Sequence, residues 1–228
     1  MSVQYESVQL VTQYPDVFNV TAPAWAVGRD VWPRKPGVFI RKKQATVEAA
    51  ADPEKPALEL IAGQLGLVPP WVKSASDARL RSTKLVNARS ETVTTSNNFR
   101  GAWLNGQRCI VPMMAFLEDD FRSGKAVPTR IARVDGKPMG VAGLWESWTG
   151  SSGDVIISYT LLTVNANSHA LIHRYQQPGA EKRMLVVLNE GAYGAWLNAH
   201  PEKAREFMRA YPANWLNANP VEKKPGPR

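Results

Sequence analysis

Residues 154–164 read Asp154-Val-Ile-Ile-Ser-Tyr-Thr-Leu-Leu-Thr-Val164, an almost unbroken series of β-branched, apolar and aromatic side chains. Such a series predicts a largely buried β-strand. Shorter runs of the same kind occupy residues 37–41, 108–111 and 139–142. Asp135-Gly136 and Ser151-Ser-Gly153 have the residue types of tight turns, so we expect each to join two strands as a hairpin. The middle of the chain is therefore predicted to be mainly antiparallel sheet.

Helices are predicted nearer the end of the chain. Residues 190–198 and 201–211 carry Ala, Leu, Met, Glu and Arg at helical spacing, and Pro201 suits a first helical turn. A shorter helix is expected from Asn167, as its N-cap, to Arg174. The chain therefore mixes strands and helices without an internal repeat.

Two segments are predicted to lie outside this regular structure. Residues 44–57 are polar and contain Ala, Glu and Pro, which is typical of a surface loop or insertion. Residues 221–228 form a charged, Pro-rich basic tail that we expect to be disordered. Residues 1–220, which include the first of these segments, are predicted to form one domain.

The composition favours a soluble, cytoplasmic protein. With 228 residues, of which 44% are hydrophobic and 21% charged, the chain can bury one good core. It has no run of about 18 apolar residues and no basic-then-apolar start, so we expect neither a membrane span nor a signal peptide. Cys109 is the only cysteine, which excludes an internal disulfide and favours a small buried hydrophobe in a strand.

The charge favours an anionic partner. The net charge is +8 and the isoelectric point is near 9.7. Eight Trp residues strengthen a nucleic-acid interpretation, because aromatic faces stack on unpaired bases while Arg and Lys follow phosphates. Trp is also ordinary core material, so composition alone leaves this partner open.

A pair of histidines raises the question of a metal. His169 and His173 stand at i and i+4 of the predicted helix and share one face. No His-Glu-x-x-His pattern accompanies them, and His200 precedes a proline in another segment. We therefore predict no metal and no cofactor, with His169 exposed on the helix and His173 either functional or a satisfied polar residue.

The most specific signal is a series of short motifs in fixed order. They are Leu65-Gly-Leu-Val-Pro69-Pro-Trp71-Val-Lys73, Asn87-Ala-Arg89-Ser-Glu91-Thr92, Phe99-Arg100, Arg108-Cys-Ile-Val-Pro112, Phe116-Leu-Glu118, Ala142-Gly-Leu-Trp-Glu146, Leu162-Thr163 through Asn167 to His173, and Lys182-Arg183-Met184. In this order they resemble the SOS response-associated peptidase (SRAP) family. Trp32-Pro33 through Arg41 is similar to the family's early proline-rich segment, so the resemblance spans residues 1 to about 200.

The resemblance implies an α+β fold around a distorted antiparallel barrel with flanking helices. It also implies a positively charged groove for single-stranded DNA and for junctions next to a duplex. Family members remove Met1, react with the ring-opened aldehyde of an abasic site and form a covalent protein–DNA cross-link. Their peptidase activity chiefly processes their own N-terminus. We accordingly expect a monomer that associates with the nucleoid when bound to DNA.

By position, the resemblance implies catalytic roles for Asn87, Glu118 and His173. Glu118 can take the proton that an α-amine must lose before it attacks an aldehyde, and can activate water for cleavage after Met1. His173 can donate to the sugar oxygen as the abasic ring opens, and Asn87 can orient the N-terminus or the lesion. From the residues alone, Glu118 favours a structural ion pair, and the alternative for Asn87 is a turn or cap.

The resemblance also implies that Trp71, Arg89 and Arg183 line the DNA groove. Guanidinium forks suit phosphate oxygens and fix position without reading sequence. Trp71 would stack on or wedge beside a base, and its alternative is a groove-side core residue after Pro69-Pro70.

The start of the chain departs from the family pattern, which is Met-Cys-Gly-Arg followed by Tyr or Phe. Here it reads Met1-Ser2-Val3-Gln4-Tyr5. A Cys thiolate can close onto an imine as a durable five-membered ring, whereas a Ser hydroxyl is essentially never ionised. The α-amine survives the change and, with a pKa of about 7.7–8.0, is partly unprotonated at neutral pH. We therefore predict catalytic Schiff-base chemistry at Ser2, with lyase activity or a weak cross-link.

Two alternatives remain open at this stage. One is a DNA-binding module without turnover, in which the groove persists but the diverged N-terminus no longer reacts. The other keeps the fold and the peptidase chemistry but acts on a different substrate.

Overall fold

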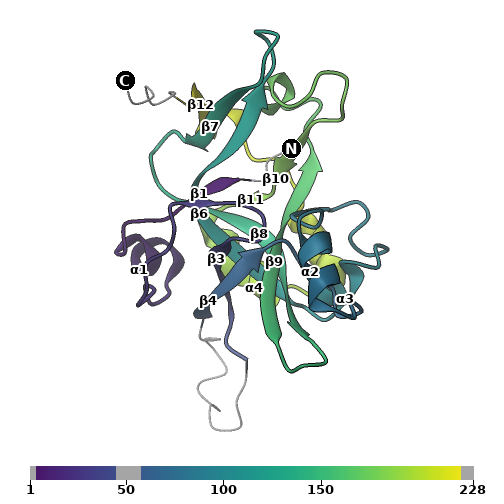
Figure 1. The fold of residues 1–228 in the computed structure, drawn as a ribbon. Coiled ribbons are helices and arrows are strands. Elements are labelled where there is room, and N and C mark those ends of the chain that lie inside the picture. Colours follow the sequence, from purple (N-terminus) through teal and green to yellow (C-terminus); the bar gives the residue numbers. More distant parts are fainter. Residues whose placement is uncertain (1–3, 45–57, 222–228) are drawn as a thin grey trace, which may run out of the picture.

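A closed barrel of five strands forms the centre of the protein in the computed structural model, which describes residues 4–44 and 58–221 (Figure 1). The barrel strands are β3 (Pro36–Lys42), β4 (Leu58–Leu65), β6 (Arg108–Asp120), β8 (Met139–Thr149) and β9 (Val155–Asn165). They follow the order β8, β9, β4, β3, β6, and β6 pairs back onto β8. The β4–β9 pair is parallel and the others are antiparallel. The predicted α+β fold with a distorted, mainly antiparallel barrel is confirmed.

Shorter strands extend this sheet beyond the barrel. They are β1 (Tyr5–Ser7), β2 (Asp30–Val31), β5 (Asn87–Arg89), β7 (Val127–Arg133), β10 (Arg183–Leu185), β11 (Val187–Leu188) and β12 (Leu216–Pro220). β7 pairs with the second half of β6, and β12 pairs with β7, so these strands build the upper part of the molecule in Figure 1.

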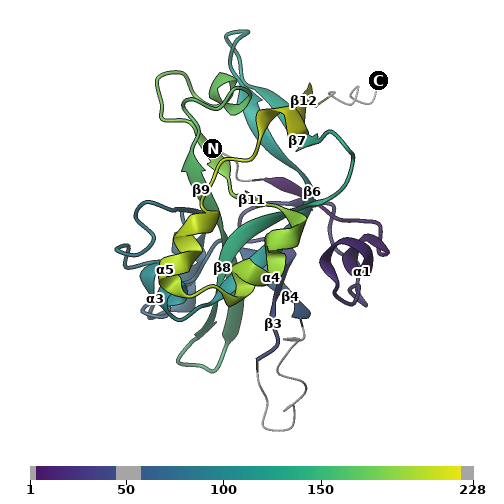
Figure 2. The same ribbon diagram turned by 180° about the vertical axis from the view of Figure 1, so that it is seen from behind.

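Short helices flank the barrel. They are α1 (Gln13–Phe18), α2 (Ala75–Ser82), α3 (Arg100–Leu104), α4 (Tyr193–Asn198) and α5 (Pro201–Ala204), with 3₁₀ turns η1 (Ile172–Arg174), η2 (Glu190–Ala192), η3 (Arg205–Phe207) and η4 (Ala213–Trp215). α4 and α5 lie on the face seen in Figure 2. There the Trp196 indole N–H donates to the Cys109 carbonyl oxygen at 2.9 Å, which ties α4 to β6.

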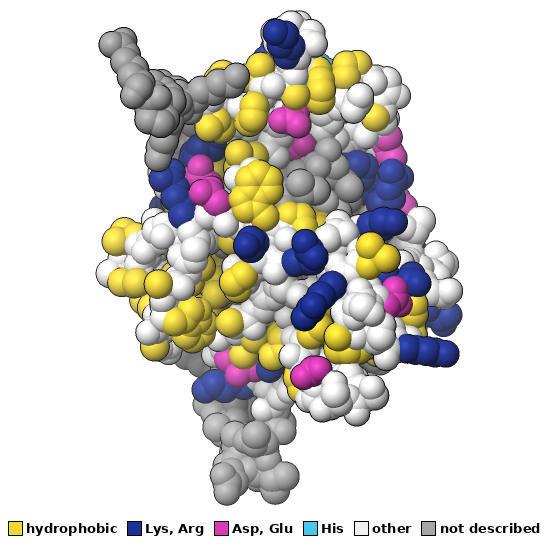
Figure 3. Space-filling model, viewed as in Figure 1, with side chains coloured by type: hydrophobic (Ala, Val, Ile, Leu, Met, Phe, Trp, Pro, Cys, Tyr) yellow, Lys and Arg dark blue, Asp and Glu magenta, His cyan; other side chains and the backbone are white. Residues whose placement is uncertain are grey.

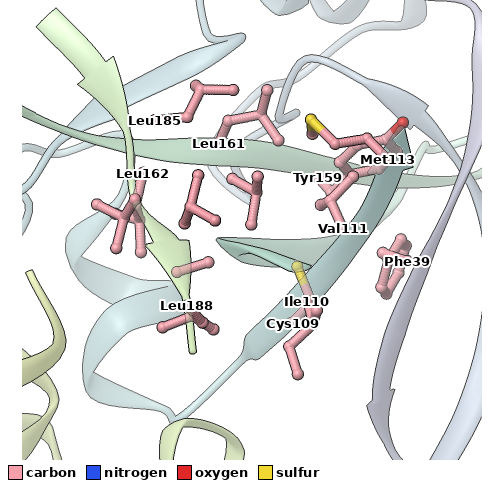
Figure 4. Packing of buried hydrophobic residues seen from close by; sticks show 14 of the residues in the cluster. Phe39, Cys109, Ile110, Val111, Met113, Tyr159, Leu161, Leu162, Leu185 and Leu188 are labelled. Atoms are coloured by element: carbon pink, nitrogen blue, oxygen red, sulfur yellow. The ribbon is translucent and has the colours of Figure 1, made fainter. Parts of the chain in front are cut away.

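Aliphatic and aromatic side chains fill the barrel, and Figure 4 shows part of this core around Phe39, Ile110, Tyr159 and Leu161. Cys109 is completely buried among them, and burial raises the pKa of its thiol well above the ordinary value. The expectation of a small buried hydrophobe at Cys109 is confirmed. The eight Trp residues divide between core and surface: Trp103, Trp145, Trp148 and Trp196 are buried, whereas Trp25, Trp32, Trp71 and Trp215 are 43–47% exposed.

One of the two predicted hairpins is confirmed and the other is wrong. Residues 151–153 join β8 to β9, with Thr149 opposite Val155 and Gly153 at φ +86°. Asp135-Gly136 also forms a turn, with Gly136 at φ +71°. In the described part of the chain, however, β7 and β8 pair with successive halves of β6 rather than with each other. The continuous length of β6 explains this, because it offers both strands an edge.

The predicted helix over residues 167–174 is wrong except for the turn η1. The His169 ring explains the difference: its Nδ1 accepts from the backbone N–H groups of Leu171 and Ile172, at 3.2 and 3.0 Å. A side chain that takes these donors replaces the helical carbonyls. His169 is also buried rather than exposed, and its Nε2 lies 2.7 Å from the Tyr211 carbonyl oxygen.

The helix predicted over 190–198 is confirmed as η2 followed by α4. The helix predicted over 201–211 is shorter and consists of α5 and η3, because Met208 leaves the helical region at ψ 73°. Beyond it, Tyr211 is buried and packs edge-on against Trp215 at 5.5 Å.

Three expectations fall on undescribed residues. The predicted loop or insertion at 44–57 lies there except for Gln44, the basic tail except for Val221, and Ser2 entirely. Within residues 4–44 and 58–221, no helix is long and apolar enough to cross a membrane. In the same ranges no three His, Cys, Asp or Glu side chains gather as a metal ion would require.

Candidate nucleic-acid interface

The short strand β5 brings Asn87 and Arg89 to the edge of β9. β4 and β5 use the same edge in succession: Leu65 lies opposite Tyr159 and Asn87 opposite Leu161, both in parallel pairing. The chain leaves this edge at Gly66, forms α2, and returns. Gly66 has φ +109°, and a Cβ there would lie 2.2 Å from the Ser82 carbonyl oxygen. The glycine thus permits the close packing that returns β5 to the barrel.

Arg183 is buried next to this edge. It begins β10 opposite Asn165 of β9, and its side chain is 2% exposed. Both terminal nitrogens pair with the two carboxylate oxygens of Glu91, and Nη2 donates to Glu91 Oε2 at 2.8 Å and to the Thr163 carbonyl at 2.9 Å. The hydrogen bonds from Arg183 lower the pKa of Glu91 to about 2. Arg183 therefore has its guanidinium fully occupied.

Arg89 is more accessible, with a side chain 53% exposed. Its Nη1 donates to Glu181 Oε2 at 2.7 Å. The other oxygen of Glu181 accepts from Asn165 Nδ2 at 2.8 Å and from Arg183 Nη1 at 2.9 Å. These bonds, from Asn165 first and Arg183 second, lower the pKa of Glu181. Glu91 and Glu181 thus balance the charges of the two arginines.

Glu118 lies near the end of β6 and is 4% exposed. β1 runs antiparallel to β6, with Tyr5 opposite Phe116. The Leu117 N–H donates to the Gln4 carbonyl oxygen at 3.2 Å. The first described residue of the chain is therefore beside Leu117, one residue before Glu118.

The segment 166–182 connects β9 to β10 and contacts the end of β6. Its ends meet where the Ala166 N–H donates to the Lys182 carbonyl at 2.7 Å. Gln176 anchors its middle: the backbone N–H donates to the Asp119 carbonyl at 2.8 Å, and the side-chain oxygen accepts from the Arg183 N–H at 3.1 Å. This segment therefore joins the end of β6 to the start of β10.

His173 is exposed on the same segment. Its Nδ1 lies 2.7 Å from the His169 carbonyl oxygen. Because a carbonyl oxygen only accepts, Nδ1 carries a proton and the lone pair of the neutral ring is on Nε2. Among the described residues Nε2 has no hydrogen-bond partner.

Trp71 is 43% exposed at the start of the excursion that contains α2. Its indole N–H donates to the Asn97 carbonyl at 3.2 Å, in the loop that follows β5. The Arg81 guanidinium covers one ring face at 4.8 Å and is itself held by both oxygens of Asp77. Lys and Arg side chains gather across the middle of the face in Figure 3 and over its α2 side.

Comparisons with known proteins identify the family to which the chain belongs. The family model described as "SOS response associated peptidase (SRAP)" matches residues 2–226. The chain belongs to this family. A solved structure of a Bordetella bronchiseptica protein has a TM-score of 0.86 and 40% identity, covering 98% of this chain and all of that one.

Two curated relatives of this SRAP protein carry functional names. The abasic site processing protein YoqW of Bacillus subtilis is 29% identical over 160 residues, which cover 68% of this chain and 66% of that protein. The abasic site processing protein HMCES of Gallus gallus is 23% identical over 209 residues, which cover 83% of this chain and 59% of that protein. The chain thus spans less than two thirds of either relative's length.

Of the residues named from the SRAP sequence pattern, the structure joins Arg89 and Arg183 directly and connects Glu118 to them only through its neighbour Asp119. Arg89 and Arg183 share the carboxylate of Glu181, and Gln176 links Arg183 to Asp119, the neighbour of Glu118. Trp71 stands apart and reaches this group only through the loop after β5. The described contacts of His173 lie within its own segment.

Three contributors to the site escaped prediction: Asn165, Gln176 and Glu181. Gln176 contacts Asp119 and Glu181 contacts Arg89 from distant parts of the sequence, whereas Asn165 contacts Glu181 across 16 positions, and all three residue types are common on any surface. Glu91 was quoted within its motif but received no role. The position of Glu181, two residues before Arg183, is the one signal that the sequence offered.

Proposed function

We propose that this SRAP protein binds single-stranded or junction DNA at abasic sites and reacts with the lesion through the α-amine of Ser2. The observation that carries the proposal is the pairing of β1 with β6, which places Gln4, the first described residue, beside Leu117, the neighbour of the buried Glu118. The names of YoqW and HMCES support the lesion as substrate. We propose no metal and no cofactor.

Arg89 is the proposed phosphate contact, because its side chain is exposed and its partner Glu181 is shared with other donors. A phosphate oxygen can replace the carboxylate without a change in the number of charge-assisted hydrogen bonds. Trp71 offers a half-exposed ring face on which a base can stack, worth roughly 1–3 kcal/mol. Arg183 reaches phosphate only if Glu91 is displaced.

The proposed chemistry begins with proton transfer. Glu118 accepts a proton from the α-ammonium group, and the neutral nitrogen attacks the aldehyde carbon of the opened sugar. Asn87 orients the reacting groups without a change of charge. His173, when protonated, donates from Nε2 to the ring oxygen as the sugar opens. Loss of water from the resulting carbinolamine gives a protonated imine.

Two fates of the imine follow from Ser2. Removal of a proton from the neighbouring sugar carbon expels the 3′ phosphate and cleaves the strand. Alternatively, the Ser2 hydroxyl adds to the imine carbon and its proton is released, but the five-membered ring closes slowly because a neutral hydroxyl is a weaker nucleophile than a thiolate. The same Glu118 carboxylate can activate water for removal of Met1, which generates the reactive amine.

Borohydride trapping tests this proposal. The protein, with its N-terminal mass measured first, is incubated with a single-stranded oligonucleotide that carries one abasic site. We expect a covalent adduct with borohydride and little or none without it, since only reduction makes the imine permanent. A durable adduct without reductant would contradict the assigned weakness of Ser2. No adduct under either condition, with salt-dependent binding retained, would leave the DNA-binding module without turnover as the function.

A further inference from the structure

A second basic site lies at the opposite end of β6. Arg108 begins this strand and Glu118 stands ten residues later, which corresponds to roughly 33 Å along an extended strand. A cavity of about 660 Å³ opens beside Arg108, between the end of β3, the turn before β6 and the middle of β8. Pockets of roughly 300–1,000 Å³ hold small organic ligands, so the size suits a bound molecule.

Arg108 is a buried cation without a counter-ion in the described structure. It is 3% exposed, and its guanidinium packs against the rings of both Trp103 and Trp196, 5.6 Å from each centroid. Within the described residues the guanidinium makes one hydrogen bond, from Nη2 to the Trp103 carbonyl, which is long at 3.5 Å, and Nε has no partner. Burial lowers the pKa of Arg108. The folded protein therefore already bears the free-energy cost of removing this charge from water. A bound anion would neutralise the charge.

Gly106, in the turn before β6, lies close to both the Arg108 guanidinium and the cavity. Gly106 lines the cavity and has φ +70°, and a Cβ there would stand 3.3 Å from Arg108 Nη1. The guanidinium thus approaches the cavity wall at a residue that carries no side chain. A side chain at this position would crowd the one terminal nitrogen that makes no described hydrogen bond.

The rim of the cavity adds further positive charge. Lys42 and Lys43 line it and form no ion pair within the described residues. Arg41 also lines it but is neutralised by Glu59 at 2.7 Å and stacks on Trp145 at 4.2 Å. The one carboxylate in the lining, Glu146, accepts from Gln107 Nε2 at 3.0 Å and from the Ser147 N–H at 3.1 Å. Cations without partners therefore outnumber carboxylates.

We propose that this cavity binds a small phosphate-bearing molecule, with Arg108 as the buried counter-ion and Lys42 and Lys43 as the contacts at the rim. A phosphoryl group fits this set because its several oxygens can accept from one guanidinium and two ammonium groups at once. Inorganic phosphate and the phosphate of a nucleotide share this chemistry. The site is separate from the DNA-binding end of the barrel.

Calorimetric titration of the full chain with inorganic phosphate and, separately, with deoxyadenosine monophosphate tests the proposal at constant ionic strength. We expect saturable binding of one molecule per chain and a change in Trp fluorescence. Equal affinities assign the site to the phosphoryl group alone, and a tighter nucleotide assigns it to nucleotides. No saturable binding of either probe would overturn the proposal, as would competition by single-stranded DNA with an abasic site.

Variants separate the cavity from the rest of the basic surface. Lys42→Gln and Lys43→Gln should each weaken binding about threefold to tenfold, the effect of one charge-assisted contact. Lys125→Gln, at an exposed lysine in the turn after β6, should leave binding unchanged. Arg108→Met should abolish it. If Arg108→Met does not fold, the two lysine variants decide, and unchanged affinity in both would overturn the assignment.

Discussion

The two ends of β6 hold their arginines in opposite ways. At the Glu118 end, Arg89 and Arg183 are paired with Glu91 and Glu181, and a network of hydrogen bonds fixes all four side chains. At the other end, Arg108 packs against two indole rings and forms no ion pair with a carboxylate in the described structure. Paired arginines can exchange a carboxylate for a phosphate, whereas an unpaired one attracts an anion permanently. Under the two proposals, the same residue type would make a reversible DNA contact at one end and hold a bound anion at the other.

Substitution of Glu118, the proposed proton acceptor, should have the largest effect on the rate of the proposed reaction. Glu118→Gln is expected to slow adduct formation on abasic DNA by about 100-fold or more, the range of general acid–base catalysis. Affinity for undamaged single-stranded DNA should stay unchanged, because the groove cations remain. Trapping kinetics and fluorescence anisotropy measure the two effects. Asp119→Asn, at the exposed neighbouring carboxylate, is the matched control, and an equal loss there would contradict the role of Glu118.

Arginine-to-methionine changes at the two ends should differ in their effect on stability. Arg183→Met leaves the Thr163 carbonyl without its guanidinium donor and Glu91 without its partner, so we expect a loss of about 1–3 kcal/mol in the free energy of unfolding. Arg108→Met removes an unpaired buried charge and should be neutral or stabilising. Urea unfolding of both variants provides the comparison. A greater loss from Arg108→Met would remove the distinction between the two ends.

Substitutions of Arg89 and of its partner Glu181 should change the affinity for DNA in opposite directions. Arg89→Ala is expected to weaken binding to single-stranded DNA about fivefold and to reduce the salt slope by about one. Glu181→Gln should strengthen binding, because Arg89 then lacks a competing carboxylate. Lys203→Gln, on α5 at the back of the molecule, controls for general charge loss. Weaker binding in Glu181→Gln would show that the carboxylate holds Arg89 in its productive position.

The smallest expected effect is the loss in acid of the contribution that Glu91 makes to stability. The pKa of Glu91 is lowered to about 2 by Arg183, so its contribution to stability is complete above the ordinary carboxyl pKa of about 4.3. It is lost as the pH falls from there through about 2. The melting temperatures of the wild type and of Glu91→Gln should therefore differ most above pH 5 and converge toward pH 2. A constant difference across this range would contradict the pairing.

The sequence predicted the parts of the fold that local chemistry determines. The run 154–164 became β9, the turn 151–153 became a hairpin, and Cys109 is buried as expected. The features that sequence reasoning missed depend on contacts between distant segments. The His169 ring caps its own backbone and binds Tyr211, and this replaced a helix that spacing alone favoured.

The candidate site shows the same division. Motif order identified the family and named Arg89, Arg183 and Glu118, because these residues stand in recognisable local patterns. The carboxylates that hold the arginines are recognisable only in three dimensions: Glu181 meets Arg89 across 92 positions of sequence. Pairing of β4 and β5 along one edge of β9 is equally non-local, since α2 separates them.

Peptide mapping of the borohydride-trapped adduct tests the central claim most directly. The reduced protein–DNA product is digested, and mass spectrometry locates the peptide that carries the sugar remnant. The N-terminal peptide beginning at Ser2 should carry it, with a mass that corresponds to a secondary amine at the α-nitrogen. A remnant on an internal lysine, or an N-terminal peptide that still contains Met1 and no remnant, would contradict the account.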